Sequence, residues 1–140
     1  MTALETMREF IASYPDYDVL SRLDIDYTDK VPNAGGLFSN GLVEVSRSTD
    51  LLGNVTVTNQ LNFALYTTLE KWEDGTDNAE WEIDFQQWVQ AQSIRGLAPA
   101  FGDEPRREVI TAQNGQLSSA DDEGTALYAI QISVQFVKNY

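Results

Sequence analysis

The chain has 140 residues, a formal net charge of −13, and neither cysteine nor histidine. Its length fits a single domain over residues 1–140 with one hydrophobic core. The missing cysteines exclude disulfides and thiolate catalysis, and the missing histidines remove the commonest general base and metal ligand.

The acidic charge also narrows the class of partners. Tight binding to nucleic acid requires clustered Lys and Arg, so we expect no specific nucleic-acid binding. The first ten residues have no apolar core typical of a signal peptide, and no apolar run approaches the ~20 residues that span a bilayer. We therefore expect synthesis in the cytoplasm and no membrane contact.

The first predicted element is a helix over residues 2–14. Thr2 is a suitable N-cap and Glu5 follows three positions later, which is the capping-box pattern. Apolar residues recur at helical spacing and predict one buried face, formed by Leu4, Met7, Ile11 and Tyr14. Pro15 is expected to end this helix.

Three strands and a long loop are predicted next. A short strand covers residues 22–28, where apolar residues alternate with aspartates. Residues 29–41 are rich in glycine and predict a loop, and long loops are often functional. A second strand follows over 42–48. The third, over 54–69, exceeds the usual ~5–6 residues and can therefore bend, carry a bulge or extend beyond its own sheet.

The main helix is predicted over residues 78–95. Asp77 is the expected N-cap, with Glu80 at the third position, and Gly96 is the expected C-cap. One face carries a stripe at helical spacing, formed by Trp81, Phe85, Trp88, Val89 and Gln92. This spacing favours packing against the core over a ligand pocket.

Two further strands complete the predicted fold. The fourth covers residues 107–113, followed by Asn114-Gly115, the strongest short hairpin signal in the chain. A second turn at 121–124 leads into the last strand, 125–138, which is apolar on one side and should lie centrally under the main helix. The order of elements predicts an α+β fold: a mostly antiparallel sheet of four to five strands with two helices packed on one face.

The acidic clusters are the first candidates for chemistry. None has the ligand spacing of an EF-hand calcium loop, and we expect no metal site. Asp24 and Asp26 share one strand face and could form a carboxylate pair, but the pattern favours a solvated strand edge.

Six residues are the candidates for contact with a partner protein. Leu37 and Phe38 are two apolar residues in the predicted loop, where exposure would suit a contact. Trp72 lies in a polar connector and is a candidate interface anchor. The remaining three are in or beside the connector over 96–105: Phe101, Arg106 and Arg107.

The chain resembles the tail-terminator and minor capsid proteins of siphophages and prophages of Gram-positive bacteria. The order of several short motifs carries this resemblance: Tyr14-Pro15 after the first helix, Leu52-Gly53 before the long strand with Asn62-Phe63, residues 84–90 (Asp-Phe-Gln-Gln-Trp-Val-Gln), residues 99–103 (Pro-Ala-Phe-Gly-Asp), Asn114-Gly115, and residues 124–128 (Gly-Thr-Ala-Leu-Tyr).

The resemblance implies a structural role without a reaction or cofactor. Such proteins form a ring, typically a hexamer, on the head-proximal end of the tail tube. The expected partners are other copies of the chain, the tail tube protein and a head-completion protein. The expected location is the host cytoplasm and then the virion, at the head–tail junction.

Two alternatives remain open. The chain can be a different head-completion or minor capsid component. It can also be a small α+β ligand-binding or enzymatic domain, in which Asp24, Asp26 and Tyr128 would line an acidic pocket.

Overall fold

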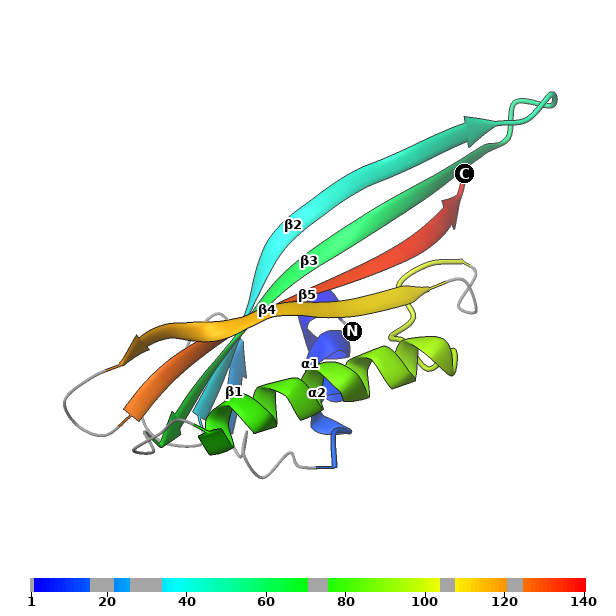
Figure 1. Ribbon diagram of the computed structural model, residues 1–140. Helices are drawn as coiled ribbons and strands as arrows, with labels where there is room; N and C mark the ends of the chain where they lie inside the picture. The colour runs from blue at the N-terminus through cyan, green and yellow to red at the C-terminus, as the bar shows by residue number, and fades with distance from the viewer. Residues whose placement is uncertain (1, 16–21, 26–33, 71–75, 104–107, 121–124) are drawn as a thin grey trace.

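The residues described in the computed structural model form seven helices and strands (Figure 1). Their bounds are α1 Ala3–Ala12, β1 Arg22–Ile25, β2 Ala34–Thr49, β3 Val55–Glu70, α2 Thr76–Ile94, β4 Val109–Ala120 and β5 Thr125–Asn139. The structure describes residues 2–15, 22–25, 34–70, 76–103, 108–120 and 125–140.

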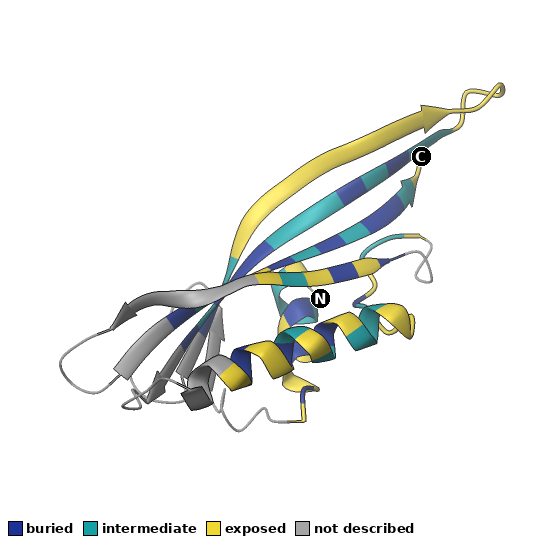
Figure 2. Cartoon of the chain, viewed as in Figure 1, coloured by how far each residue is buried: buried dark blue, intermediate teal, exposed yellow. Residues whose placement is uncertain are grey.

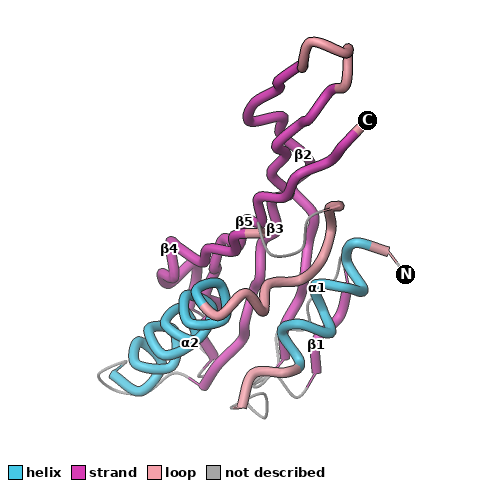
Figure 3. The backbone as a smooth tube through the Cα atoms, turned by 90° about the vertical axis from the view of Figure 1, so that its right-hand side faces the viewer, coloured by secondary structure: helices cyan, strands magenta, loops and turns pink. Residues whose placement is uncertain are grey.

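The strands form one sheet in the order β1-β2-β3-β5-β4. β1 runs parallel to β2, and the other neighbouring pairs are antiparallel. Both helices lie on the same face of the sheet (Figures 1 and 3). The predicted α+β fold, a mostly antiparallel sheet with two helices on one face, is therefore confirmed.

The capping box predicted for the first helix is present. The Glu5 backbone N–H donates to the Thr2 hydroxyl at 3.1 Å, and the Thr2 N–H donates to the Glu5 carboxylate at 3.0 Å. These two bonds satisfy N–H groups that a helix start leaves without partners. The helix ends at Ala12, three residues before Pro15, and buries Met7 and Ile11.

We expect Thr2→Ala to lower the free energy of unfolding by about 1 kcal/mol, because alanine cannot accept the hydrogen bond from Glu5. Chemical denaturation of both proteins measures this difference. Thr2→Ser is the matched control, since it keeps the hydroxyl acceptor and should stay close to the wild type. Equal losses in the two variants would contradict a capping role.

The hydrophobic core lies between the helices and the middle of the sheet. Its largest members that are almost fully buried come from six elements: Met7, Ile11, Leu37, Phe63, Leu65, Phe85, Val89, Ile110, Ile130, Ile132 and Val134. The residues from β3 are odd-numbered, and those from β5 are even-numbered. Strict alternation places each set on one face of its strand. This is the face that the sequence pattern predicts to be apolar.

Aromatic rings join the two helices to each other. Tyr14 makes edge contacts with Phe85 at 5.2 Å and with Trp81 at 6.3 Å between ring centroids. Phe10 lies 5.0 Å from Trp88 by the same measure. The predicted stripe of the main helix is thus confirmed as core, with Trp81, Phe85 and Val89 buried.

Two local predictions on β2 and α2 are wrong. Residues 34–41 are not a loop, because β2 begins at Ala34 and pairs along nearly the full length of β3. Gly36 lies opposite Tyr66 there, so the glycine leaves room for the aromatic side chain.

α2 begins at Thr76, so Asp77 lies inside the helix and is not its N-cap as predicted. Gly96 does end it as predicted, at a positive φ of 72°.

The predicted hairpin turn at Asn114-Gly115 is also wrong. β4 continues through this dipeptide to Ala120. Between Gln113 and Gln116 the strand advances three positions while β5 advances only two, from Gln131 to Ala129. The extra residue is therefore a local irregularity inside the strand. Pairing with β5 resumes beyond it, so the chain does not turn back at this point.

Candidate protein-interaction site

One part of the sheet extends beyond the layer of helices. We call residues 41–58 the arm; they are the distal halves of β2 and β3 and the loop between them (Figure 1). Every residue from Ser39 to Asn54 is exposed, and Figure 2 shows this stretch as an unbroken run in the colour of exposed residues. β3 is the inner strand of this arm; it pairs with β5 from Thr56 to Glu70 and therefore does not extend beyond the sheet, which was one of the possibilities left open by its length.

The loop at the tip of the arm is held by Asp50. Its carboxylate accepts hydrogen bonds from the N–H groups of Leu52 and Asn54, both at 2.9 Å, and from the Asn54 amide at 3.0 Å. These bonds lower the pKa of Asp50, with the Asn54 side chain as the largest cause. Gly53 takes a positive φ of 86° that favours glycine. The tip is therefore an ordered turn, even though it is exposed.

Apolar side chains concentrate on this ordered surface. Leu51 is fully exposed and Leu52 is 88% exposed. Leu42, Val43 and Val45 are about half exposed on the outer strand of the arm. Exposed apolar side chains gathered on one projecting part of a protein can mark a site for contact with another molecule. The arm is therefore the strongest candidate for a protein-binding surface.

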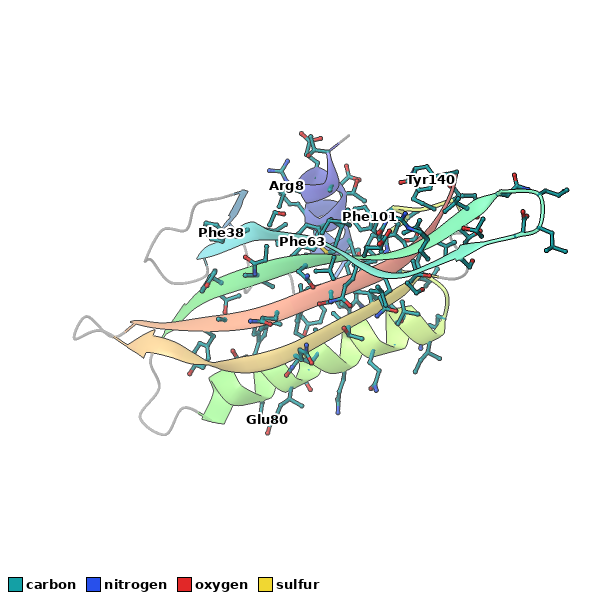
Figure 4. The ribbon with its side chains drawn as sticks, turned by 90° about the horizontal axis from the view of Figure 1, so that it is seen from above. Arg8, Phe38, Phe63, Glu80, Phe101 and Tyr140 are labelled. Carbon is teal, nitrogen blue, oxygen red and sulfur yellow. The ribbon has the colours of Figure 1, made fainter. Side chains whose placement is uncertain are left out.

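The inner face of the arm contains a hollow of about 440 Å³. Its lining residues are Leu42, Glu44, Arg47, Val55, Val57, Asn59 and Tyr140. Glu44 and Arg47 form an ion pair of 2.7 Å across the bulge in β2. The Tyr140 N–H donates to the Val55 carbonyl at 2.8 Å and fixes the chain end beside the arm (Figure 4).

The outer edge of β2 is open along the arm. β1 pairs with β2 only from Ala34 to Leu37, and no other described strand pairs with the outer edge beyond that point. An open edge presents unpaired N–H and C=O groups to which another strand can add. The bulges after Ser39 and Glu44 interrupt this edge and limit uncontrolled pairing.

At the opposite edge of the sheet, side chains of α2 form hydrogen bonds with some of the backbone groups of β4. The Ile110 N–H donates to the Ser93 hydroxyl at 3.2 Å, and the Gln86 amide donates to the Ala112 carbonyl at 3.4 Å. A groove of about 500 Å³ lies along this contact, and we call it the α2–β4 groove. Its lining residues are Gln86, Gln87, Gln90, Ser93, Ile94, Val109, Ile110, Thr111 and Ala112.

The connector after α2 is held against the end of β5. The buried Glu108 carboxylate accepts N–H bonds from Phe101 and Gly102, each with a shortest distance of 2.8 Å. Desolvation raises the pKa of Glu108, and these backbone bonds oppose the rise. A Cβ on Gly102 would collide with the Val137 carbonyl, so only glycine allows this approach.

The structure places three of the six predicted contact residues. Leu37 is 0% exposed in the core, so its prediction as an exposed loop residue is wrong: it lies on the face of β2 that the helices cover. Phe38 is half-buried against Tyr66, at 5.4 Å between ring centroids. Phe101 is half-buried between Phe63 and Phe136 (Figure 4). Trp72, Arg106 and Arg107 lie outside the described residues.

The structure does not bring together Asp24, Asp26 and Tyr128, the three residues suspected for an enzymatic or ligand-binding role, among the side chains that it describes. Tyr128 is buried in the apolar core, while the Asp24 side chain and all of Asp26 lie outside what the structure describes. Across the described positions, no group of three or more potential metal ligands occurs. None of the helices in the described part of the chain combines the length and apolarity that crossing a bilayer requires.

Glu82 is a buried carboxyl that the sequence analysis missed. Its side chain lies on α2, and the residue is 4% exposed. No described group forms a hydrogen bond with its Oε1 atom. Burial raises the pKa of Glu82 to about 7. Glu82 lines neither the hollow nor the α2–β4 groove.

Neither protein-family models nor curated proteins give a match to this chain.

Proposed function

We propose that the chain is a structural protein of a bacteriophage particle that caps the tail tube, ends its polymerisation and joins the tail to the head, and that it assembles through the arm as part of a ring. The observation that carries the assembly role is the exposed apolar tip of the arm, Leu51 and Leu52. The phage setting comes from the resemblance of the ordered sequence motifs.

The geometry suits a ring of identical subunits. Such a ring needs a heterologous interface, in which two different surfaces of the chain meet around a closed circle. The arm projects from the domain on one side and offers a surface separate from the core. Because the turn at the tip of the arm is already ordered by its bonds to Asp50, little conformational entropy would be lost when it binds.

We expect Leu51→Glu and Leu52→Glu each to prevent capping and joining while changing the free energy of unfolding by at most about 0.5 kcal/mol, because both side chains are exposed. Electron microscopy of tails made with each variant measures tail length and attachment to heads. Ile83→Glu, at a half-exposed position on α2, is the matched control because it introduces the same charge outside the arm.

The same microscopy separates the proposal from its alternatives. Overlong tails without the chain support a terminator. Tails of normal length that stay unjoined would indicate a head-completion component. Normal tails joined to heads in the absence of the chain would overturn the structural role. Turnover of a small molecule by the purified chain would support the enzymatic alternative.

A further inference from the structure

The tip of the arm and the α2–β4 groove are two separate surfaces with matching chemistry. At the tip, Leu51 and Leu52 are exposed. In the groove, Ile94 is 81% exposed and Val109 is about half exposed, and both lie beside uncharged polar side chains. A groove of about 500 Å³ is large enough to hold several side chains of a partner.

The absence of charge in the groove lining makes it compatible with a second copy of the chain. Two copies of a chain with net charge −13 repel each other unless their contact surfaces are nearly neutral. All nine residues lining the groove are uncharged. The arm carries Glu44, Arg47 and Asp50, which sum to −1. Arg47 neutralises Glu44, and the Asp50 carboxylate is occupied by bonds within its own turn.

We propose that the tip of the arm of one copy occupies the α2–β4 groove of a second copy. Leu51 and Leu52 contact Ile94 and Val109 there, and the glutamines of α2 form the polar rim. The two surfaces differ, so the contact is heterologous and can be repeated from subunit to subunit. This inference rests on the proposed assembly role of the arm and names the surface that receives it.

The absence of cysteine from the chain makes a disulfide test direct. Leu52→Cys and Gln90→Cys each introduce one thiol, at the tip and in the groove. A disulfide forms only when the two Cα atoms approach within about 7 Å, so it reports contact between these positions. The variants are mixed at about 1 mM each, where contacts with a Kd of up to about 1 mM are populated, and oxidised.

We expect the mixture to give a disulfide-linked heterodimer at least about tenfold faster than a control mixture of Leu52→Cys with Glu80→Cys, because a tenfold ratio corresponds to a preference of only 1.4 kcal/mol. Glu80 is exposed on α2 but lies outside the groove. Equal rates in the two mixtures, a dominant Leu52→Cys homodimer, or no linkage would each overturn the docking.

The outcome is independent of the microscopy described above. Tip variants that abolish capping while the tip–groove disulfide fails to form would retain the assembly role of the arm and refute only this groove. Rapid linkage in solution together with normal tails in the absence of the chain would retain the contact and refute the phage role.

Discussion

Replacing Phe85 with alanine is expected to lower the free energy of unfolding by about 3–5 kcal/mol, the range for truncating a buried aromatic residue. Phe85 is fully buried, and its ring contacts Tyr14, which follows the first helix, and two tryptophans from its own helix. The substitution leaves a cavity where both helices meet the sheet. Urea denaturation followed by tryptophan fluorescence measures the loss.

Ile83→Ala is the matched control for this prediction. Ile83 lies two residues away on the same helix but is about half exposed, so its truncation should cost about 1 kcal/mol or less. A loss at Phe85 no larger than that at Ile83 would contradict the position of α2 over the core.

The sequence predicts the regular elements well because their patterns are long. The third and last strands keep a period of two over about fifteen residues, and their predicted bounds differ from the observed ones by at most one residue. The main helix is marked by its apolar stripe, of which the structure buries Trp81, Phe85 and Val89. Such patterns reflect burial on one face, which is a local property of the chain.

The errors occur where a neighbouring strand decides the outcome. Glycine-rich residues 34–41 have low intrinsic strand propensity, yet they pair because β3 offers its edge over the same length. Asn114-Gly115 would form a tight turn in isolation, but β5 continues beside it. Sequence patterns within one segment cannot contain this non-local information.

The candidate interaction site also depends on parts of the fold that a single segment of sequence does not reveal. Leu37 is predicted to be exposed because its segment resembles a loop, and it is instead core. The leucines at 51 and 52 become an exposed tip because the turn held by Asp50 lies beyond the helices. Two apolar residues between two predicted strands are the one sequence signal that could have indicated it.

Glu82→Gln is expected to flatten the pH dependence of stability. The pKa of Glu82 is about 7 in the folded chain and 4.5 for an ordinary glutamate, so the folded state binds more protons between these values. Its contribution to the free energy of unfolding therefore falls as the pH rises from about 4.5 to 7, and it stays low above 7. Each pKa unit corresponds to 1.36 kcal/mol, and rearrangement of the protein around the charged carboxylate reduces the total to about 2 kcal/mol.

The measurement is urea denaturation of the wild type and Glu82→Gln at several pH values from about 4.5 to 8. The variant should gain about 2 kcal/mol relative to the wild type across this range, because glutamine carries no charge that burial would penalise. Glu80→Gln, an exposed position on the same helix, controls for the loss of one negative charge from an acidic chain and should follow the wild-type curve. Parallel curves for the wild type and Glu82→Gln would mean that the carboxyl is paired or solvated at neutral pH. In that case Glu82 would not be a buried acid that holds its proton up to a pH of about 7.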